Sequence, residues 1–456
     1  MSRRDFYEQT SSGRAPTRQI GCAVRQNPRI LLLSEFIPWD PVKSVWGAFH
    51  RLGRHLTALD HLGPVDLAFF SPAYRQLSPG EITALGGIAR RMWPLRGTVH
   101  FVAPSAPKCL LDRVSDVYWA LRGFVGFVGD RPSMNTCRPR QIESLEQILR
   151  LSKPDLIFAH RLNAAVPLLR IRLQLPPIVV DFDDLESVRL ERLAISRQHP
   201  ADRWRAHFRA MLARLAQRRV GAIAAALLVC SELEQRKVQL MCPEGHVFSI
   251  PNTATPFGDL TSSSKPVAVF VGTAHYQPNC EALSWFTNEV WPHIRRAVPE
   301  AQFVVVGDKT EELGISSKQL GIETLGFVED LAPIYAAAML AICPIRRGSG
   351  TRIKIVEAAV NGRPVISTTL GAEGLEFNPG TEILLEDSAA GFADACIQLF
   401  KDPTQAAQIG RAAKRRALST YPEHRVADRL RAICIDALCG GPVAAVGPDK
   451  WPGARP

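Results

Sequence analysis

The stretch RRGSGTRIKIVE at residues 346–357 follows a short aliphatic run that ends at Pro344. An apolar run, a glycine-rich turn and an amphipathic helix in this order are typical of a parallel α/β sheet. Glycines at a helix start leave backbone N–H groups free at the positive end of the helix dipole, which favours a bound anion. Arg352 and Lys354 fall in the predicted first turn, where cations oppose the dipole unless a negative ligand is present. The stretch therefore predicts a phosphate-binding site.

Glu357 extends this site along the predicted helix. It follows Lys354 by three residues, so the two side chains share a helix face and lie about 4.5 Å apart along the axis. With a diphosphate at the helix start, Glu357 would lie near a ribose, because a carboxylate accepts hydrogen bonds from two vicinal hydroxyls. A surface helix that carries a Lys–Glu pair is the alternative interpretation.

Beyond this stretch, short apolar runs alternate with longer amphipathic ones, which indicates strand–helix repetition and two parallel sheets. Continuous aliphatic runs are expected for strands that are covered on both faces. The first set of strands is expected at 29–34, 65–70, 98–102, 155–160, 177–181, 226–230 and 247–250. The second set is expected at 267–272, 302–307, 323–327, 340–344, 364–367 and 383–385.

The chain is long enough for two domains, with 456 residues of which 46% are hydrophobic and 22% charged. The segment between the two strand sets loses apolar periodicity and gains Pro, Ser, Thr and Gly, so it is the predicted linker. The expected organisation is a mobile amino-terminal segment at 1–28, a first domain at 29–250, the linker at 251–266, a second domain at 267–423, a helix at 424–439 and a mobile tail at 440–456.

The net charge of +11 favours anionic partners such as nucleotide phosphates, nucleic acid or an acidic membrane. No run approaches the roughly 18 apolar residues of a membrane-spanning helix, and the amino terminus lacks the apolar core of a signal peptide. We therefore expect a cytoplasmic protein. Its charge leaves open whether it binds the inner face of the membrane. The ten cysteines show no C-x-x-C pair and are expected to be reduced thiols.

The stretch GSGTRIKIVEAAVNGRPVISTTLGAEGL at 348–375 resembles the donor-binding region of retaining glycosyltransferases of the group 1, or family 4, type. The order and spacing of the motifs fit from about residue 267 to 421, with a looser fit at VCSE (229–232) and IPN (250–252). This resemblance implies the α/β GT-B architecture. In that architecture two Rossmann-like, doubly wound parallel-sheet domains face a central cleft, and the carboxyl-terminal one binds a nucleotide sugar.

The resemblance also implies roles for individual residues. Arg352 and Lys354 would hold the diphosphate as catalytic groups without a metal or a cofactor, and Glu357 would hold the ribose. Further donor contacts are expected from the glycine-rich loop, from the loop after the next strand and from a helix start in the first domain: Gly348, Ser349, Gly350, Thr351, Thr369, Gly371, Ala372, Glu373 and Gly47. The sequence departs from the family pattern at Ser349, where many members have Glu, and at 273–276, where many have a basic pair.

Three of these assignments have structural alternatives. The amides of the loop at 368–375 would meet the sugar or the phosphates, but the loop also fits a plain glycine-rich connection. Gly47 ends the segment KSVWG at 43–47 and is its one residue that permits close backbone approach. His160 ends a predicted strand, where ligand crevices form, and by resemblance would contact the transferred sugar as a catalytic residue; a structural histidine is the alternative.

Asp181, Asp183 and Asp184 close another predicted strand. Three carboxylates are able to hold Mg²⁺ or Mn²⁺, which is one interpretation. The other is a helix cap or an acceptor-side role, because this segment belongs to the domain not assigned to the donor. The second interpretation is the one that we adopt, and no metal is expected.

Basic amphipathic stretches with aromatic residues occur at 90–93, 111–128 and 203–219. Arginine beside aromatic residues on a helix is typical of peripheral contact with an anionic membrane, which would suit a lipid-linked acceptor. Solvated helix faces packed on a core are an equally good interpretation.

The expected reaction transfers a hexosyl group from a nucleoside-diphosphate sugar to a hydroxyl of a glycan or lipid-linked saccharide, with retention by analogy. A nucleotide-sugar epimerase of the same architecture and a non-catalytic sugar-nucleotide-binding protein remain as alternatives. A nicotinamide dehydrogenase is disfavoured, because SEFIP at 34–38 stands where G-x-G-x-x-G is required. Nucleic acid is not expected as a partner, because no aromatic platform or recognised module is found.

Overall fold

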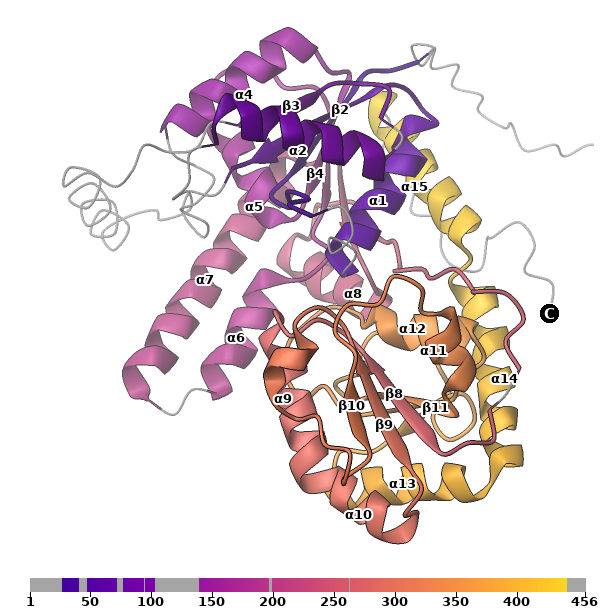
Figure 1. The fold of residues 1–456 in the computed structure, drawn as a ribbon. Helices are drawn as coiled ribbons and strands as arrows, with labels where there is room; N and C mark the ends of the chain where they lie inside the picture. Colours follow the sequence, from indigo (N-terminus) through magenta and orange to yellow (C-terminus); the bar gives the residue numbers. More distant parts are fainter. Residues whose placement is uncertain are drawn as a thin grey trace, which may run out of the picture.

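The computed structural model describes residues 27–40, 47–71, 77–93, 95–102, 139–196, 199–261 and 263–440. The expected terminal segments at 1–26 and 441–456, the segment 43–46 and the basic stretch 111–128 lie outside the described residues. Figure 1 shows two parallel-sheet domains, one above the other. We call them the amino-terminal domain and the carboxyl-terminal domain.

The sheet of the amino-terminal domain has the strand order β3-β2-β1-β4-β5-β6-β7, and every neighbouring pair is parallel. Its strands are β1 (Ile30–Ser34), β2 (Val65–Phe70), β3 (Val99–Val102), β4 (Leu156–His160), β5 (Ile178–Asp181), β6 (Ala226–Val229) and β7 (Val247–Ser249). The order reverses between β1 and β4, and in such sheets ligands bind beyond the carboxyl ends of the strands at the reversal. The register places Ser34 beside His160, and His160 beside Asp181, at that edge.

The carboxyl-terminal domain repeats the same topology, with the order β10-β9-β8-β11-β12-β13, again parallel throughout. Its strands are β8 (Val267–Val271), β9 (Gln302–Val306), β10 (Ile322–Thr324), β11 (Leu340–Cys343), β12 (Val365–Ser367) and β13 (Leu384–Leu385). Here the order reverses between β8 and β11, so the glycine-rich loop after β11 lies at the reversal. The α/β architecture of two doubly wound sheets is therefore confirmed.

Each predicted strand is present, usually shorter by one or two residues at its ends. The clearest shift is the strand predicted at 323–327. It is observed as β10 at Ile322–Thr324, and Gly326 beyond its end adopts a φ of 65°, which favours glycine.

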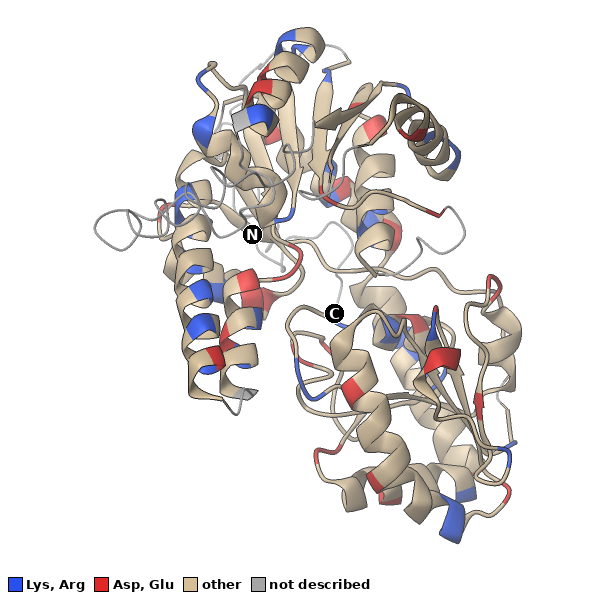
Figure 2. Ribbon diagram, turned by 60° about the vertical axis from the view of Figure 1, so that its left-hand side comes forward, with Lys and Arg blue, Asp and Glu red and all other residues tan. Residues whose placement is uncertain are grey.

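A long helical hairpin projects from the amino-terminal domain and lies beside the carboxyl-terminal one. It consists of α6 (Glu186–Ser196) and α7 (Pro200–Ile223). Figure 2 shows lysine and arginine residues in bands along these helices. Within the described ranges, no helix is both long and apolar enough to span a bilayer.

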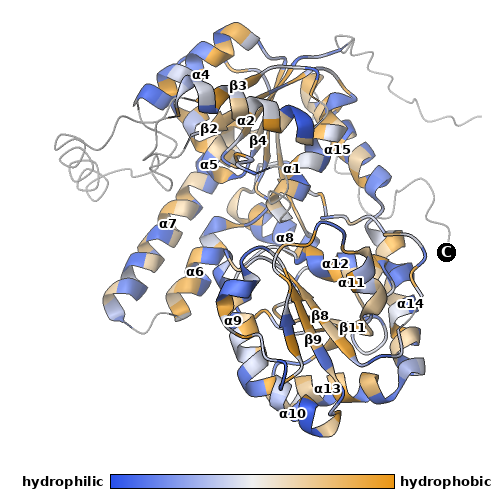
Figure 3. Ribbon diagram, viewed as in Figure 1, coloured by the Kyte–Doolittle hydropathy of each residue, from blue (hydrophilic) through white to orange (hydrophobic). Residues whose placement is uncertain are grey.

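Helices cover both faces of each sheet, and Figure 3 shows the hydrophobic strands between them. In the amino-terminal domain, α1 (Gly47–Asp60) and α2 (Pro79–Met92) pack on one face, while α4 (Pro139–Ser152), α5 (Leu162–Ala165), η1 (Val166–Arg170), α7 and α8 (Glu232–Met241) pack on the other. In the carboxyl-terminal domain, the helical segments are α9 (Gln277–Trp285), η2 (Phe286–Val290), α10 (Trp291–Ala297), η3 (Thr310–Leu313), α11 (Ala332–Ala337), α12 (Ile353–Val360), α13 (Ala389–Lys401) and α14 (Pro403–Thr420). Coverage of both faces explains why the strands are continuous aliphatic runs.

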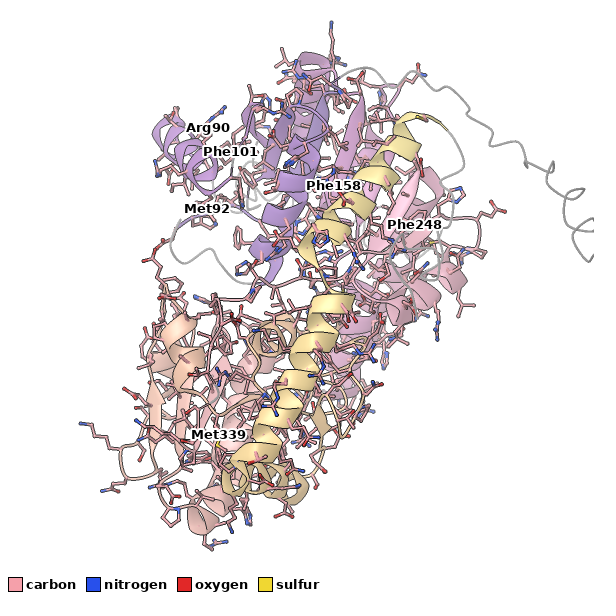
Figure 4. The ribbon with its side chains drawn as sticks, turned by 90° about the vertical axis from the view of Figure 1, so that its right-hand side faces the viewer. Arg90, Met92, Phe101, Phe158, Phe248 and Met339 are labelled. Carbon is pink, nitrogen blue, oxygen red and sulfur yellow. The ribbon has the colours of Figure 1, made fainter. Side chains whose placement is uncertain are left out.

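The last described helix, α15 (Glu423–Leu438), leaves the carboxyl-terminal domain and packs on α1 of the other domain. Its Val426, Leu430 and Ile433 are buried in the same core as Phe158 of β4. Figure 4 shows α14 on one domain continuing into α15 on the other. The sequence had left open which domain this helix covers, and its apolar face completes the core of the amino-terminal domain.

Candidate functional site at the domain interface

The glycine-rich loop connects β11 to α12 at the edge that faces the amino-terminal domain. Gly348 and Gly350 have φ values of 108° and 76°, a region that only glycine enters without strain. A Cβ on Gly350 would stand 3.4 Å from the carboxylate of Asp184, which belongs to the other domain. The two glycines therefore let the loop turn, and the second of them lies beside Asp184 of the other domain.

Arg352 is the residue that immediately precedes α12, with φ −91° and ψ 97°, and not a residue of its first turn as the sequence predicted. Its guanidinium folds back on the loop and donates to the carbonyl oxygens of Ser349 and, at 2.9 Å, of Gly350. The side chain is 8% exposed, and its Nε has no hydrogen-bond partner among the described residues. Arg352 thus fixes the shape of the loop in addition to supplying positive charge.

Lys354 lies in the first turn of α12 and reaches under the end of β8. Its Nζ donates to Asn279 Oδ1 at 3.0 Å and stands 3.7 Å from the centre of the Phe270 ring. Burial lowers the pKa of this amine to about 8. Among the described residues it forms no salt bridge, and the charge of Glu357, one turn along the helix, acts on it only at longer range. A Cβ on Gly272 would come within 2.6 Å of Nζ, which explains glycine at that position.

Glu357 lies on the same helix one turn further on. Its Oε1 accepts a hydrogen bond of 2.7 Å from the hydroxyl of Tyr335 on α11. Burial raises the pKa of Glu357, although Tyr335 and Lys354 act in the opposite direction. One carboxylate oxygen is therefore held by the protein, which orients the group that the resemblance assigns to the ribose.

The loop after β12 carries the other expected donor contacts. The amide and hydroxyl of Thr369 donate to Asp387 at 2.9 and 2.7 Å. The amides of Gly371 and Ala372 donate to the side chain and the carbonyl of Thr368, at 2.9 and 3.1 Å. The amides of Gly371 and Ala372 are thus hydrogen-bonded within the loop, as expected for a plain glycine-rich connection.

The amino-terminal domain contacts both loops of the carboxyl-terminal domain. Arg192 of α6 donates to the carbonyl of Gly348 at 2.7 Å and forms an ion pair of 2.7 Å with Glu373. Lys237 of α8 lies 3.6 Å from the same carboxylate. The hydroxyl of Ser349 donates to Asp184 Oδ1. The loops predicted to bind the donor are therefore held from across the interface.

A hydrogen-bonded chain joins the buried end of β5 to the glycine-rich loop. Arg51 of α1 binds Asp181 through two bonds of 2.7 Å and donates to Asn252 Oδ1 at 3.2 Å. The amide of Asn252 in turn donates to the hydroxyl of Thr351 at 3.0 Å. Gly47, at the start of α1, also approaches this region, because a Cβ there would stand 3.7 Å from Ile353.

The carboxylates at the end of β5 are occupied by protein groups. His55 Nε2 lies 2.8 Å from Asp181. Burial raises the pKa of Asp181, but Arg51 and His55 lower it more, so it lies well below its usual range. Asp183 binds Arg161 at 2.9 Å. Among the described residues, no group of three or more His, Cys, Asp or Glu side chains is arranged to hold a metal.

His160 is fully buried between Ser34, whose hydroxyl lies 3.4 Å from Nδ1, and Phe36, whose ring centre lies 5.7 Å away. Burial lowers its pKa to about 3. Its Nε2 has no hydrogen-bond partner among the described residues. The packing around the ring is that of a structural histidine, but the unpartnered Nε2 is not explained by it, so contact of His160 with a sugar stays a prediction.

The sequence analysis did not identify Arg161 or Arg192 as site residues. Arg161 follows β4 with a φ of 73° and binds Asp183, whose φ is 53°. Non-glycine residues in this region are strained and concentrate at functional sites. The signal for Arg161 was its place directly after a strand, whereas Arg192 lies on an ordinary amphipathic helix and carried no local signal.

Comparisons with known proteins agree with this geometry. Residues 265–402 match the family model described as "Glycosyl transferases group 1". An uncharacterized 44.6 kDa protein in the cps region of Klebsiella pneumoniae is 25% identical over 143 residues, which are 29% of this chain. The match spans only about 37% of the length of that relative.

Solved structures resemble the whole fold. Sucrose-phosphate synthase from Thermosynechococcus elongatus has a TM-score of 0.59 at 16% identity, over 89% of this chain and 97% of that one. HepE from Anabaena in complex with UDP-glucose has 0.55 at 16% identity, over 89% and 98%. The pneumococcal O-GlcNAc transferase GtfA in complex with UDP and GlcNAc has 0.63 at 9% identity, over 90% and 99%. Residues 265–402 therefore resemble a group 1 glycosyltransferase domain, and the chain as a whole shares the GT-B fold of these solved structures.

Proposed function

We propose that this chain transfers a hexosyl group from a nucleoside-diphosphate sugar to a hydroxyl of a glycan or lipid-linked saccharide, with retention at the anomeric carbon. The observation that carries the proposal is Lys354, a buried cation at the start of α12 that forms no salt bridge within the described part of the chain. The adjoining loop turns through two left-handed glycines. A diphosphate supplies the charge that this position lacks.

The proposed chemistry needs stabilisation of the departing diphosphate while positive charge develops at the anomeric carbon. Lys354 and the backbone amides at the start of α12 supply it, and Arg352 keeps the loop in place through its bonds to Ser349 and Gly350. Glu357, oriented by Tyr335, binds the ribose hydroxyls. No metal is required for these roles.

The identity of the donor nucleotide is proposed from relatives. The structures of HepE and GtfA hold UDP with a sugar, as UDP-glucose in one case and as UDP and GlcNAc in the other. Both share this fold at low sequence identity. UDP-sugars are therefore the first donors to test, with GDP-sugars as the second set.

A lipid-linked acceptor at an anionic membrane is proposed from α7. Trp204 and Met211 on this helix are 57% and 56% exposed, far above what a packed core helix shows for such side chains. Five arginines of the same helix are also exposed: Arg203, Arg205, Arg209, Arg214 and Arg218. An apolar stripe flanked by arginine suits an anionic lipid surface.

A panel of nucleotide sugars tests the donor role. Purified protein should release nucleoside diphosphate from one of them, and the same compound should raise the melting temperature. Lys354→Ala should abolish both effects, whereas Lys414→Ala, which removes a surface lysine paired with Asp259, should change neither. Equal responses of wild type and Lys354→Ala would contradict the proposed site. An epimerase would instead return an isomerised nucleotide sugar, which chromatography of the products distinguishes.

A further inference from the structure

Asp184 is a carboxylate of the amino-terminal domain that touches the donor loop of the other domain. It follows β5, and its Oδ1 accepts a hydrogen bond from the hydroxyl of Ser349, 165 positions later in the sequence. The same oxygen would stand 3.4 Å from a Cβ on Gly350. The carboxylate of Asp184 therefore lies directly beside the loop at position 350.

The charges of Arg161 and Arg189 act on this carboxylate, but neither guanidinium is hydrogen-bonded to it. The nearby arginines are engaged elsewhere, since Arg161 binds Asp183 at 2.9 Å and Arg189 donates to Glu186 at 2.8 Å. Among the described residues, Ser349 is the one side chain that donates a hydrogen bond to Asp184. A carboxylate has about four acceptor positions, so most of its capacity is open to further donors.

The charge of Asp184 decides which part of a nucleotide sugar it can meet. Two negative groups at short distance repel, so a carboxylate beside the loop does not bind the diphosphate. The phosphates have Lys354, on the far side of the loop under β8, as their cation. What remains beside Asp184 is the neutral, hydroxyl-bearing part of the donor.

Tyr276 supports this division of the site. Its hydroxyl would stand 2.8 Å from a Cβ on Gly348, so it borders the same loop. Burial raises the pKa of the phenol, Arg352 acts in the opposite direction and Asp184 in the same one, so Tyr276 stays protonated. The region around Asp184 therefore combines the hydroxyls of Ser349 and Tyr276 with a carboxylate and nearby guanidinium groups, and hydroxyl and carboxylate groups of this kind bind the hydroxyls of a pyranose.

We propose that Asp184 accepts hydrogen bonds from hydroxyls of the transferred sugar, while the carboxyl-terminal domain holds the diphosphate. This inference rests on the proposed function and adds a substrate-contacting residue from the opposite domain. The sugar part of the donor site is then complete only when the two domains are together, and donors with neutral, hydroxyl-bearing sugars are the preferred class.

The test compares a nucleotide with its sugar conjugate. Wild type and Asp184→Asn are titrated calorimetrically with UDP and UDP-glucose, and with GDP and GDP-mannose. Asp184→Asn should keep the affinity for the bare nucleotide and lose about tenfold or more in affinity for the sugar conjugate. Equal affinities of both proteins for both compounds, or equal losses for both compounds, would overturn the inference.

An exchange of the two contacting residues adds a second measurement. Asp184→Ser alone should lose sugar-conjugate binding, and Asp184→Ser combined with Ser349→Asp should recover at least part of it, because the carboxylate returns to the interface from the other side. A folded exchange variant that binds no better than Asp184→Ser would count against a role for the carboxylate. Glu232→Gln, which removes one exposed negative charge at the start of α8, is the matched control and should bind like wild type.

Failure of this inference differs from failure of the proposed function. Wild-type protein that binds none of the four compounds contradicts nucleotide-sugar binding itself. Wild-type protein that binds a conjugate more tightly than its nucleotide, together with an Asp184→Asn variant that does the same, contradicts only the role of Asp184. Melting temperatures of all variants within about 3 °C of wild type confirm that folding is not the cause.

Discussion

Arg192 of α6 and Glu373 of the loop after β12 form an ion pair of 2.7 Å across the domain interface. The two side chains are 23% and 27% exposed, so solvent screens the pair only in part. The same guanidinium donates to the carbonyl of Gly348, which joins the two loops of the proposed donor site through one residue of the opposite domain. The projecting α6–α7 hairpin thereby contacts both loops of the proposed donor site.

Arg192→Ala should lower kcat/KM about tenfold, because about 1 to 2 kcal/mol of loop positioning is lost when a charged hydrogen-bonding group is removed. Arg192 acts through Gly348 and Glu373, so the effect should fall mainly on KM for the donor. Arg192→Lys should restore only part of it, since lysine cannot bridge the two acceptors with a planar fork. Steady-state kinetics with varied donor measure both values.

The control for Arg192 is Arg205→Ala on α7, whose ion pair with Asp202 is 72% and 50% exposed. Such a pair contributes little, so kinetics and melting temperature should stay at wild-type values. Equal loss of kcat/KM in both variants would mean that the charge of the hairpin matters and the contact with Glu373 does not.

Donor affinity should depend on the charge of Lys354. Burial lowers its pKa to about 8 in the free protein, and a bound diphosphate favours the charged form. The affinity for nucleoside diphosphate should therefore be constant below about pH 8 and fall up to about tenfold per pH unit above it, with proton uptake on binding. Calorimetry in buffers of different ionisation enthalpy measures both. Lys354→Arg should bind without this decline, because arginine stays charged.

The lowered pKa of Lys354 also makes the stability of the fold depend on pH in a definite direction. The folded-state pKa of Lys354 lies below its ordinary value of 10.5, so the folded protein releases this proton before the unfolded chain does. The contribution of Lys354 to stability should thus become more favourable as the pH rises from about 8 to 10.5. Lys354→Met should remove that dependence in chemical denaturation of the ligand-free protein.

Arg51→Met should destabilise the fold by about 3 to 5 kcal/mol, because it leaves the buried carboxylate of Asp181 without its main cation. Asp181 is 0% exposed, and Arg51 forms two hydrogen bonds of 2.7 Å with it. Urea denaturation measures the loss, and Arg150→Met, from a pair in which Arg150 is 59% exposed, should cost less than about 1 kcal/mol. A comparable loss in both variants would contradict the importance of burial.

Since the folded-state pKa of Asp181 is depressed, the stability that it provides should be present above its ordinary pKa and decline as the pH falls below it.

The double variant Trp204→Ala and Met211→Ala should weaken binding to vesicles of phosphatidylglycerol by about tenfold or more, because it removes the two most exposed apolar side chains of α7. Added salt should also weaken binding by wild type. Leu240→Ala on α8, where the side chain is 84% exposed, is the matched control and should bind like wild type. Flotation assays that detect no preference for anionic over neutral vesicles would contradict a membrane role for the arginines.

Much of the fold was readable from local sequence. The strands are buried on both faces, so each appears as a continuous aliphatic run such as Ile30–Ser34, and a run of that kind needs no knowledge of its neighbours. The glycine-rich loop was readable for the same reason, because Gly348, Gly350 and Lys354 are close in sequence. Even here, the backbone moved Arg352 out of the helix and turned its guanidinium toward the loop carbonyls.

The site across the interface was not readable. Asp184 and Ser349 are 165 positions apart, and Arg192 and Glu373 are 181 apart. The pattern of an amphipathic helix predicts that it has an apolar face. It does not predict which surface that face covers or which distant loop its polar face contacts. The metal interpretation of Asp181 and Asp183 arose from the same limitation, because their partners Arg51 and Arg161 come from other elements.

The sequence alone determined two parallel sheets and the glycine-rich loop at the start of a helix, because strand burial and helix-start chemistry are set by residues close together in the chain. The tertiary structure alone decided that α15 completes the amino-terminal core and that Asp184 and Arg192 reach the loops after β11 and β12. Such contacts depend on how two separately folded domains are placed, and that placement results from shape and charge complementarity summed over both surfaces. No single stretch of sequence contains that information.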